Sequence, residues 1–166
     1  TRTSLGSTDI FVQQLAADGS YRWVQAAGSA LTDRGTDVTS DAEGNVYLTG
    51  TLDGDILFGS MEPDGANPDF KQFGGDATDV GEAVYVTPDG SLTYGAGSFR
   101  GTANFGGGDI DAAGGSDVVL LRLNEDGNFA SVQTFGGTLD DTAVGVHVED
   151  ADSLLLAGNF RGEATF

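Results

Sequence analysis

The sequence contains no cysteine, which excludes disulfide bonds, thiol chemistry and thiolate metal sites. It has no apolar run near the ~18–20 residues that a membrane-spanning helix needs, so no membrane insertion is expected. Residues 1–5 carry neither an initiator methionine nor the apolar core of a signal peptide, so we expect the sequence to begin inside a longer gene product.

Basic residues are scarce: seven lysines and arginines stand against 26 acidic residues, a formal net charge of −19. Such a surface repels phosphate backbones and anionic membranes, so nucleic acid is not an expected partner. The acidic residues are scattered and do not form a tail, which fits a solvated acidic exterior. Secretion, halophily and cation binding would each explain the excess, and all three remain open.

Proline is rare, with three residues, whereas glycine is abundant, with 27. The glycines lie between apolar runs rich in Val, Leu and Phe and do not follow a collagen triplet. This pattern indicates many tight turns between strands.

An internal repeat organises the chain. Residues 50–58, 97–105 and 158–166 align without a gap, each with glycine first, an apolar residue third, glycine fifth and phenylalanine last. Two further sets repeat with them. They comprise the Asp-Gly turns at 18–19, 64–65 and 126–127, and the segments 35–49, 81–92 and 142–156. In addition, residues 9–15 align with 117–123.

The repeat is interrupted at one place. Phe58 lies six residues before Asp64, but the corresponding Phe105 lies 21 residues before Asp126. We interpret the fifteen missing residues as the copy of strand 9–15. Either the unit has lost a strand or the sequence omits residues between Gly59 and Asp64. Unpaired ladder groups on both neighbouring strands would be costly, which favours an omission.

Each full unit has four apolar runs of about seven residues, separated by turn signals typical of hairpins. We therefore predict an all-β chain made of β-propeller blades of four antiparallel strands, with about three blades represented. The expected units are 1–28, 29–75, 76–137 and 138–166, in one segment of a larger propeller. Runs 118–121 and 154–156 are apolar at successive positions, so both faces of these strands should be covered. No 3.6-residue spacing supports a helical solenoid, and a β-sandwich would not predict a repeat.

The stretch from Gly35 to Gly50 ends in Gly-Asn-Val-Tyr-Leu-Thr-Gly and is followed by an Asp-apolar strand and an Asp-Gly turn. This order resembles the bacterial beta-propeller repeat (SBBP) family over nearly the whole chain. It departs at the missing strand and at 150–152, where Asp-Ala-Asp replaces the usual turn. The resemblance implies a propeller fold, usually in exported or cell-surface proteins, and no shared catalytic chemistry. Because a ring takes about four to eight blades, further blades or an oligomer are expected to complete it.

The single histidine, His147, is the only candidate general base of its type. Its aligned positions, near Asp41 and Thr87, are not histidines, and no Cys or second His could share a metal with it. We interpret it as an incidental surface side chain and expect no catalytic residues.

Asp33, Asp79 and Asp140 recur after each Gly-Ser or Gly-Gly step. They could form an acidic rim that binds Ca²⁺ or a cationic partner, since Ca²⁺ takes six to eight oxygen ligands. Alternatively, each carboxylate accepts hydrogen bonds from nearby backbone N–H groups and fixes its loop. The second interpretation explains recurrence in every unit, and no Asp-x-Asp-x-Asp-Gly calcium loop is present.

The aromatic residues could form a sugar-stacking platform, but their fixed places in the repeat favour a core between blades. The set comprises Phe11, Tyr21, Trp23, Phe58, Phe73, Phe105, Phe135 and Phe166.

The function expected from the sequence is a structural or binding module of an exported or cell-surface protein, with a protein or glycan partner and no cofactor. Two alternatives remain. The first is a Ca²⁺-stabilised adhesin or filament subunit. The second is part of a propeller hydrolase or lyase whose catalytic residues lie elsewhere.

Overall fold

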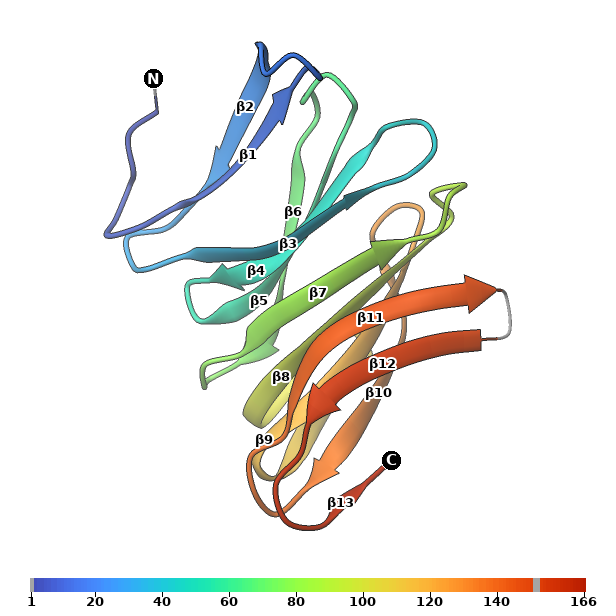
Figure 1. Cartoon of the computed structure of the whole chain (residues 1–166). Helices are drawn as coiled ribbons and strands as arrows, with labels where there is room; N and C mark the ends of the chain where they lie inside the picture. Colours follow the sequence, from blue (N-terminus) through green and yellow to red (C-terminus); the bar gives the residue numbers. More distant parts are fainter. Residues whose placement is uncertain (1, 151–152) are drawn as a thin grey trace.

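The computed structural model describes residues 2–150 and 153–166. Over these residues the protein is all-β, and every ladder between its strands is antiparallel (Figure 1). The strands are β1 (Ile10–Leu15), β2 (Tyr21–Ala27), β3 (Arg34–Ser40), β4 (Val46–Leu52), β5 (Asp55–Met61), β6 (Asp69–Gly75), β7 (Val80–Val86), β8 (Leu92–Asn104), β9 (Asp109–Asn124), β10 (Phe129–Gly137), β11 (Thr142–Asp150), β12 (Ser153–Asn159) and β13 (Ala164–Thr165). No helix in this part of the chain is long and apolar enough to cross a membrane.

The strands form two four-stranded units flanked by two hairpins. β3–β6 and β7–β10 each pair strand to strand in sequence order, while β1–β2 and β11–β12 each form a separate two-stranded sheet. Short ladders join the units: the end of β6 pairs with β8, and the end of β10 pairs with β13. The predicted all-β, antiparallel class is therefore confirmed.

The same register recurs in each unit. The anchor glycines Gly50, Gly97 and Gly158 stand opposite Gly35, Gly81 and Ala143 on the preceding strand. In all three copies the register shifts by one residue directly after that pair, which marks a β-bulge. The bulge makes Thr39, Tyr85 and His147 equivalent positions.

The prediction of a missing strand is wrong, and so is the omission inferred from it. Leu57 of β5 stands opposite Gly50, as Val119 of β9 stands opposite Gly97, so β5 is itself the copy of strand 117–123. The first unit instead lacks the long extension of β8 and β9, in which residues 102–104 pair with 109–111. Its chain turns back directly at Asp53 and Gly54, whose φ angles are 55° and 95°. With this shorter turn, β5 still pairs with both β4 and β6.

The Asp-Gly turns form as predicted. Gly19, Gly65 and Gly127 have φ angles of 83°, 78° and 68°, a region that glycine adopts without strain. The turn at 150–152, where the repeat pattern departs, includes residues 151–152, which lie outside the described part of the chain.

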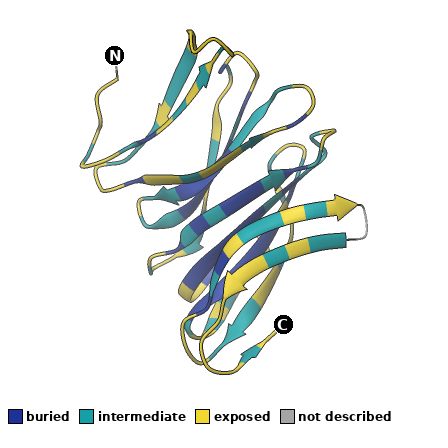
Figure 2. Ribbon diagram, in the orientation of Figure 1, coloured by how far each residue is buried: buried dark blue, intermediate teal, exposed yellow. Residues whose placement is uncertain are grey.

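The core lies between successive units, where β5, β8 and β9 carry the most buried residues (Figure 2). Its largest cluster combines Ile56 and Phe58 from the first unit with Val84, Phe99 and Val119 from the second. Residues 118–121 are buried throughout, as predicted. In the run 154–156 the prediction fails, because Leu155 is 54 % exposed. Among the described strands, the β11–β12 hairpin packs through β11 against β7, β8 and β9.

Candidate functional site

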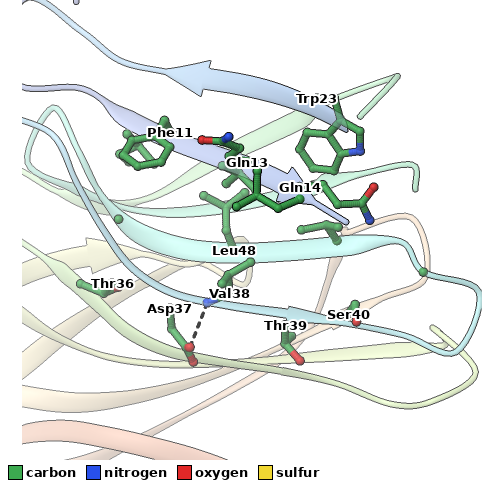
Figure 3. A pocket seen from close by; sticks show the side chains of 16 residues that line it. Phe11, Gln13, Gln14, Trp23, Thr36, Asp37, Val38, Thr39, Ser40 and Leu48 are labelled. Carbon is green, nitrogen blue, oxygen red and sulfur yellow. Dashed lines mark hydrogen bonds between the residues drawn. The ribbon is translucent and has the colours of Figure 1, made fainter. Parts of the chain in front are cut away.

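A groove of about 940 Å³ separates β1 from β3 (Figure 3). Val38 and Leu48 contribute apolar side chains to its lining, and Gln13 contributes an amide. The Thr36 hydroxyl and the Asp37 carboxylate instead contact Gly81 and Val84 of β7.

Trp23 closes one end of the groove and is held in place by the neighbouring unit. Its indole Nε1 donates a hydrogen bond of 2.9 Å to the carbonyl oxygen of Pro63. Phe11, in contrast, is 69 % exposed.

Asp33 and Asp79 are buried, and their oxygens accept hydrogen bonds from the backbone. One oxygen of Asp33 accepts from the N–H of Ser29 at 2.5 Å, and the other from the N–H of Asp53 at 2.9 Å. Asp79 accepts in the same way from Gly75 and Arg100, both at 2.9 Å. Each carboxylate joins a donor four residues before it to a donor 20 or 21 residues after it. The structural interpretation is thus confirmed for these two residues.

The prediction of Asp140 as the third member is wrong, because the equivalent residue is Asp141. Asp141 is 1 % exposed and accepts from the N–H groups of Gly137 at 2.8 Å and Arg161 at 2.9 Å. Asp140 is exposed and pairs with the Arg100 guanidinium at 2.9 Å. The Ser116 N–H and then the Arg100 charge hold the pKa of Asp140 below its usual value. The constant spacing of four residues between glycine or serine donor and acid could have identified Asp141. We call Asp33, Asp79 and Asp141 the clamp aspartates.

A second set of aspartates was missed as candidates, although the sequence signal was present. Asp9, Asp55 and Asp117 each stand 24 residues before a clamp aspartate. At Gly136 a Cβ would lie 2.6 Å from Oδ1 of Asp117 and 3.0 Å from Oδ2 of Asp141, so both carboxylates face this glycine.

Asp55 and Asp79 face Gly74 in the same way, at 2.6 and 2.5 Å from its Cβ position. Burial raises the pKa of Asp79, partly opposed by its backbone hydrogen bonds and reinforced by the charge of Asp55. Burial, and then the charge of Asp53, raises the pKa of Asp55. These are like charges held close together in a region of low polarity.

Asp117, like Asp9, has one buried oxygen without a hydrogen-bond partner among the described residues. It is 4 % exposed, and its Oδ2 accepts the N–H of Ala113 at 2.7 Å. Its Oδ1 has no hydrogen-bond partner among the described residues. No group of three or more His, Cys, Asp or Glu side chains placed to hold a metal occurs in residues 2–150 and 153–166. The Ca²⁺-stabilised alternative stays open.

His147 is exposed and stacks edge-on against Tyr85, with ring centroids 5.2 Å apart. By register its equivalents are Thr39 and Tyr85, two residues before Asp41 and Thr87, and neither is a histidine. Asp41 accepts the N–H of Asn45 at 2.8 Å and the hydroxyl of Tyr47 at 3.1 Å. Burial and the charge of Asp41 raise the pKa of Tyr47 to about 12.

The aromatic residues divide into two groups. Those that pack between units, as predicted, are Trp23, Phe58, Phe73, Phe105 and Phe135. For Phe11, Tyr21 and Phe166 the core prediction is wrong, since they are 69 %, 63 % and 76 % exposed. These three lie in the outer hairpins or near the final strand, where one neighbouring unit is lacking among the described residues.

A comparison with protein-family models and with curated protein sequences found no match to this chain. The beta-propeller repeat resemblance therefore stays a prediction.

Proposed function

We propose that each four-stranded unit is a propeller blade and that β3, β7 and β11 are innermost strands around one axis. These three strands lie side by side but belong to different units (Figure 1). Thr36 of β3 donates to the carbonyl oxygen of Gly81 at 2.5 Å, and Asp37 accepts the N–H of Val84 at 3.0 Å. Side-chain contacts therefore join neighbouring first strands where no ladder does.

The outer strands repeat a second contact between units. Gln25 on β2 donates to the carbonyl oxygen of Gly65 at 2.7 Å, and Lys71 on β6 donates to that of Asp126 at 2.7 Å. In both cases a fourth strand reaches the Asp-Gly turn of the next unit. This repeated outer contact, together with the packing of β7 on β3 and of β11 on β7, supports a stack of blades.

On this architecture the protein is a structural or binding module, without catalysis, of an exported or cell-surface protein. One observation carries this assignment: the clamp aspartates recur in all three units and hold backbone donors from two separate turns. Carboxylates engaged in this way stiffen the rim of each unit. The loops on that rim then present a fixed surface to a protein or glycan partner.

A crystal structure of the purified chain tests the architecture. We expect successive units to be related by one constant rotation about an axis beside β3, β7 and β11. A flat or sandwiched arrangement of the sheets would overturn the proposal.

Binding and catalysis are tested with the same protein on a glycan array and a panel of hydrolase and lyase substrates. Saturable binding without turnover is the expected result. Catalytic turnover that co-purifies with the protein would favour the enzyme alternative.

The calcium-stabilised alternative is favoured by one observation, the unpartnered and buried Oδ1 of Asp117. If Ca²⁺ binds only the folded protein, a concentration of 100 times Kd adds about 2.7 kcal/mol to stability. An unchanged melting temperature on adding millimolar Ca²⁺ would exclude this alternative.

A further inference from the structure

The two ends of the described fold carry complementary features. In the complete units the third strand pairs on both sides: β5 pairs with β4 and β6, and β9 with β8 and β10. Among the described strands, β1 pairs with β2 alone, although it is a third strand by register. At the other end β12, a second strand, pairs with β11 alone. In the described fold, β1 therefore has a free edge where a complete unit has a second strand, and β12 is a second strand with a free edge of its own.

The groove between β1 and β3 lies where the repeat places a first strand. β7, the first strand of its unit, packs against β3 and β4 of the preceding unit, and β11 packs in turn against β7 and β8. If this packing is continued to the unit that contains β1 and β2, a first strand lies against β3 and a second strand lies beside β1. The 940 Å³ groove occupies this place.

Exposed apolar side chains gather on both features. Phe11 and Val38 in the groove are 69 % and 57 % exposed. Val144 on β11 and Leu155 on β12 are 59 % and 54 % exposed. Apolar patches at strand edges are typical of interaction surfaces.

We propose that the β11–β12 hairpin of one copy docks in this groove of a second copy of the chain. β12 then pairs antiparallel with β1, and β11 packs on β3. This inference rests on the proposed propeller and names its partner. The occupant is argued from continuity, because the joint repeats the packing already present between the units of one copy.

The repeat also fixes the register of the joint. Gly50 stands opposite Leu57 and Gly97 opposite Val119, and both partners are equivalent to Phe11. Gly158 of one copy therefore stands opposite Phe11 of the other, and Leu155 opposite Gln14.

The number of copies follows from the units that each contributes. Among the described strands, two complete units and two half-units make three, so two copies of this 166-residue segment supply six blades. Rings hold about four to eight blades, and neither one copy nor three copies falls in this range. A head-to-tail contact that closes gives a ring instead of a fibre.

Sedimentation and light scattering test the assembly. We expect a mass twice the 17.0 kDa of the chain at protein concentrations of about 1–100 µM. Phe11→Lys should restore the 17.0 kDa species, because it puts a charge into the joint while its side chain is exposed in the single copy. The control is Tyr21→Lys, since Tyr21 is 63 % exposed on the outer strand β2 and should leave the doubled mass unchanged.

Cysteine cross-linking tests the register on a background with no native cysteine. Mixed Gln14→Cys and Leu155→Cys proteins should form a disulfide-linked pair under mild oxidation. A mixture of Gln14→Cys and Leu154→Cys should not, because a shift of one residue turns the side chain to the other face.

A single-copy mass throughout the concentration range would overturn the inference, as would open polymers or equal cross-linking at positions 154 and 155. A failure of the second-copy proposal can be distinguished from a failure of the proposed propeller. If the chain is monomeric but Gly95→Ala still destabilises it through Phe58, the units stack and only the second-copy partner is wrong.

Discussion

The ring of Phe58 on β5 occupies the position that a Cβ on Gly95 of β8 would take. The two residues belong to successive four-stranded units, and Phe58 is 5 % exposed within the main core. Gly95 is therefore required for close approach between the units, and not for a turn.

Gly95→Ala should destabilise the protein by about 1–3 kcal/mol, because the added methyl group forces the Phe58 ring out of a packed position. The control is Gly145→Ala, at which a Cβ would meet nothing within 4 Å. Chemical denaturation followed by circular dichroism measures both. Phe58→Leu in the Gly95→Ala background should recover part of the loss. Equal stability of the two alanine variants would contradict the stacking contact.

Asp141→Asn should cost about 2–3 kcal/mol, since the amide oxygen can replace only one of the two carboxylate acceptors and the NH₂ group then faces a backbone N–H donor. Asp140→Asn is the adjacent control and should change stability little, because that side chain is exposed. Thermal melts of the two variants decide which aspartate is the structural one. A larger effect at Asp140 would reverse the assignment of the clamp.

Asp117→Asn should stabilise the protein. The Asn oxygen keeps the hydrogen bond from Ala113, and the NH₂ group replaces an unpartnered oxygen near Asp141 with a donor. Relieving an unsatisfied buried group is worth about 1–3 kcal/mol. Asp117→Ala serves as the comparison and should destabilise, as it leaves the Ala113 N–H without its acceptor. A fall in melting temperature for both variants would show that the Asp117 charge is needed, as in a cation site.

Stability should rise as the pH falls from neutral toward the region just above 3.8, through the raised pKa values of Asp55 and Asp79. Because their pKa values are higher in the folded than in the unfolded chain, the folded state binds more protons in this window. The contribution is complete below the unfolded value of 3.8 and is lost as the pH rises through the folded values.

Asp55→Asn isolates this effect. The variant should be more stable than the parent chain at pH 7, and the difference should vanish below pH 3.8, where the parent carboxyl groups are protonated. Urea denaturation across the pH series measures it. A difference that does not change with pH would mean that the Asp55–Asp79 repulsion has no effect on folding.

The sequence by itself determined the features that depend on neighbouring residues. Strand positions follow from short apolar runs, and the turns at Gly19, Gly65 and Gly127 follow from the conformational freedom of glycine. The equivalence of Gly50, Gly97 and Gly158 also followed, because a repeated register preserves spacing.

Only the tertiary structure decided features that join distant segments. The hydrogen bond that Asp141 accepts from the N–H of Arg161, 20 residues away, is one such feature. The place of the fifteen-residue difference likewise emerged from strand pairing, since residues 55–58 resemble two different segments of the second unit. Phe58 and Phe11 are both repeat aromatics, yet one is buried and the other exposed. Burial depends on whether a neighbouring unit covers the side chain, and no local pattern of residues encodes that.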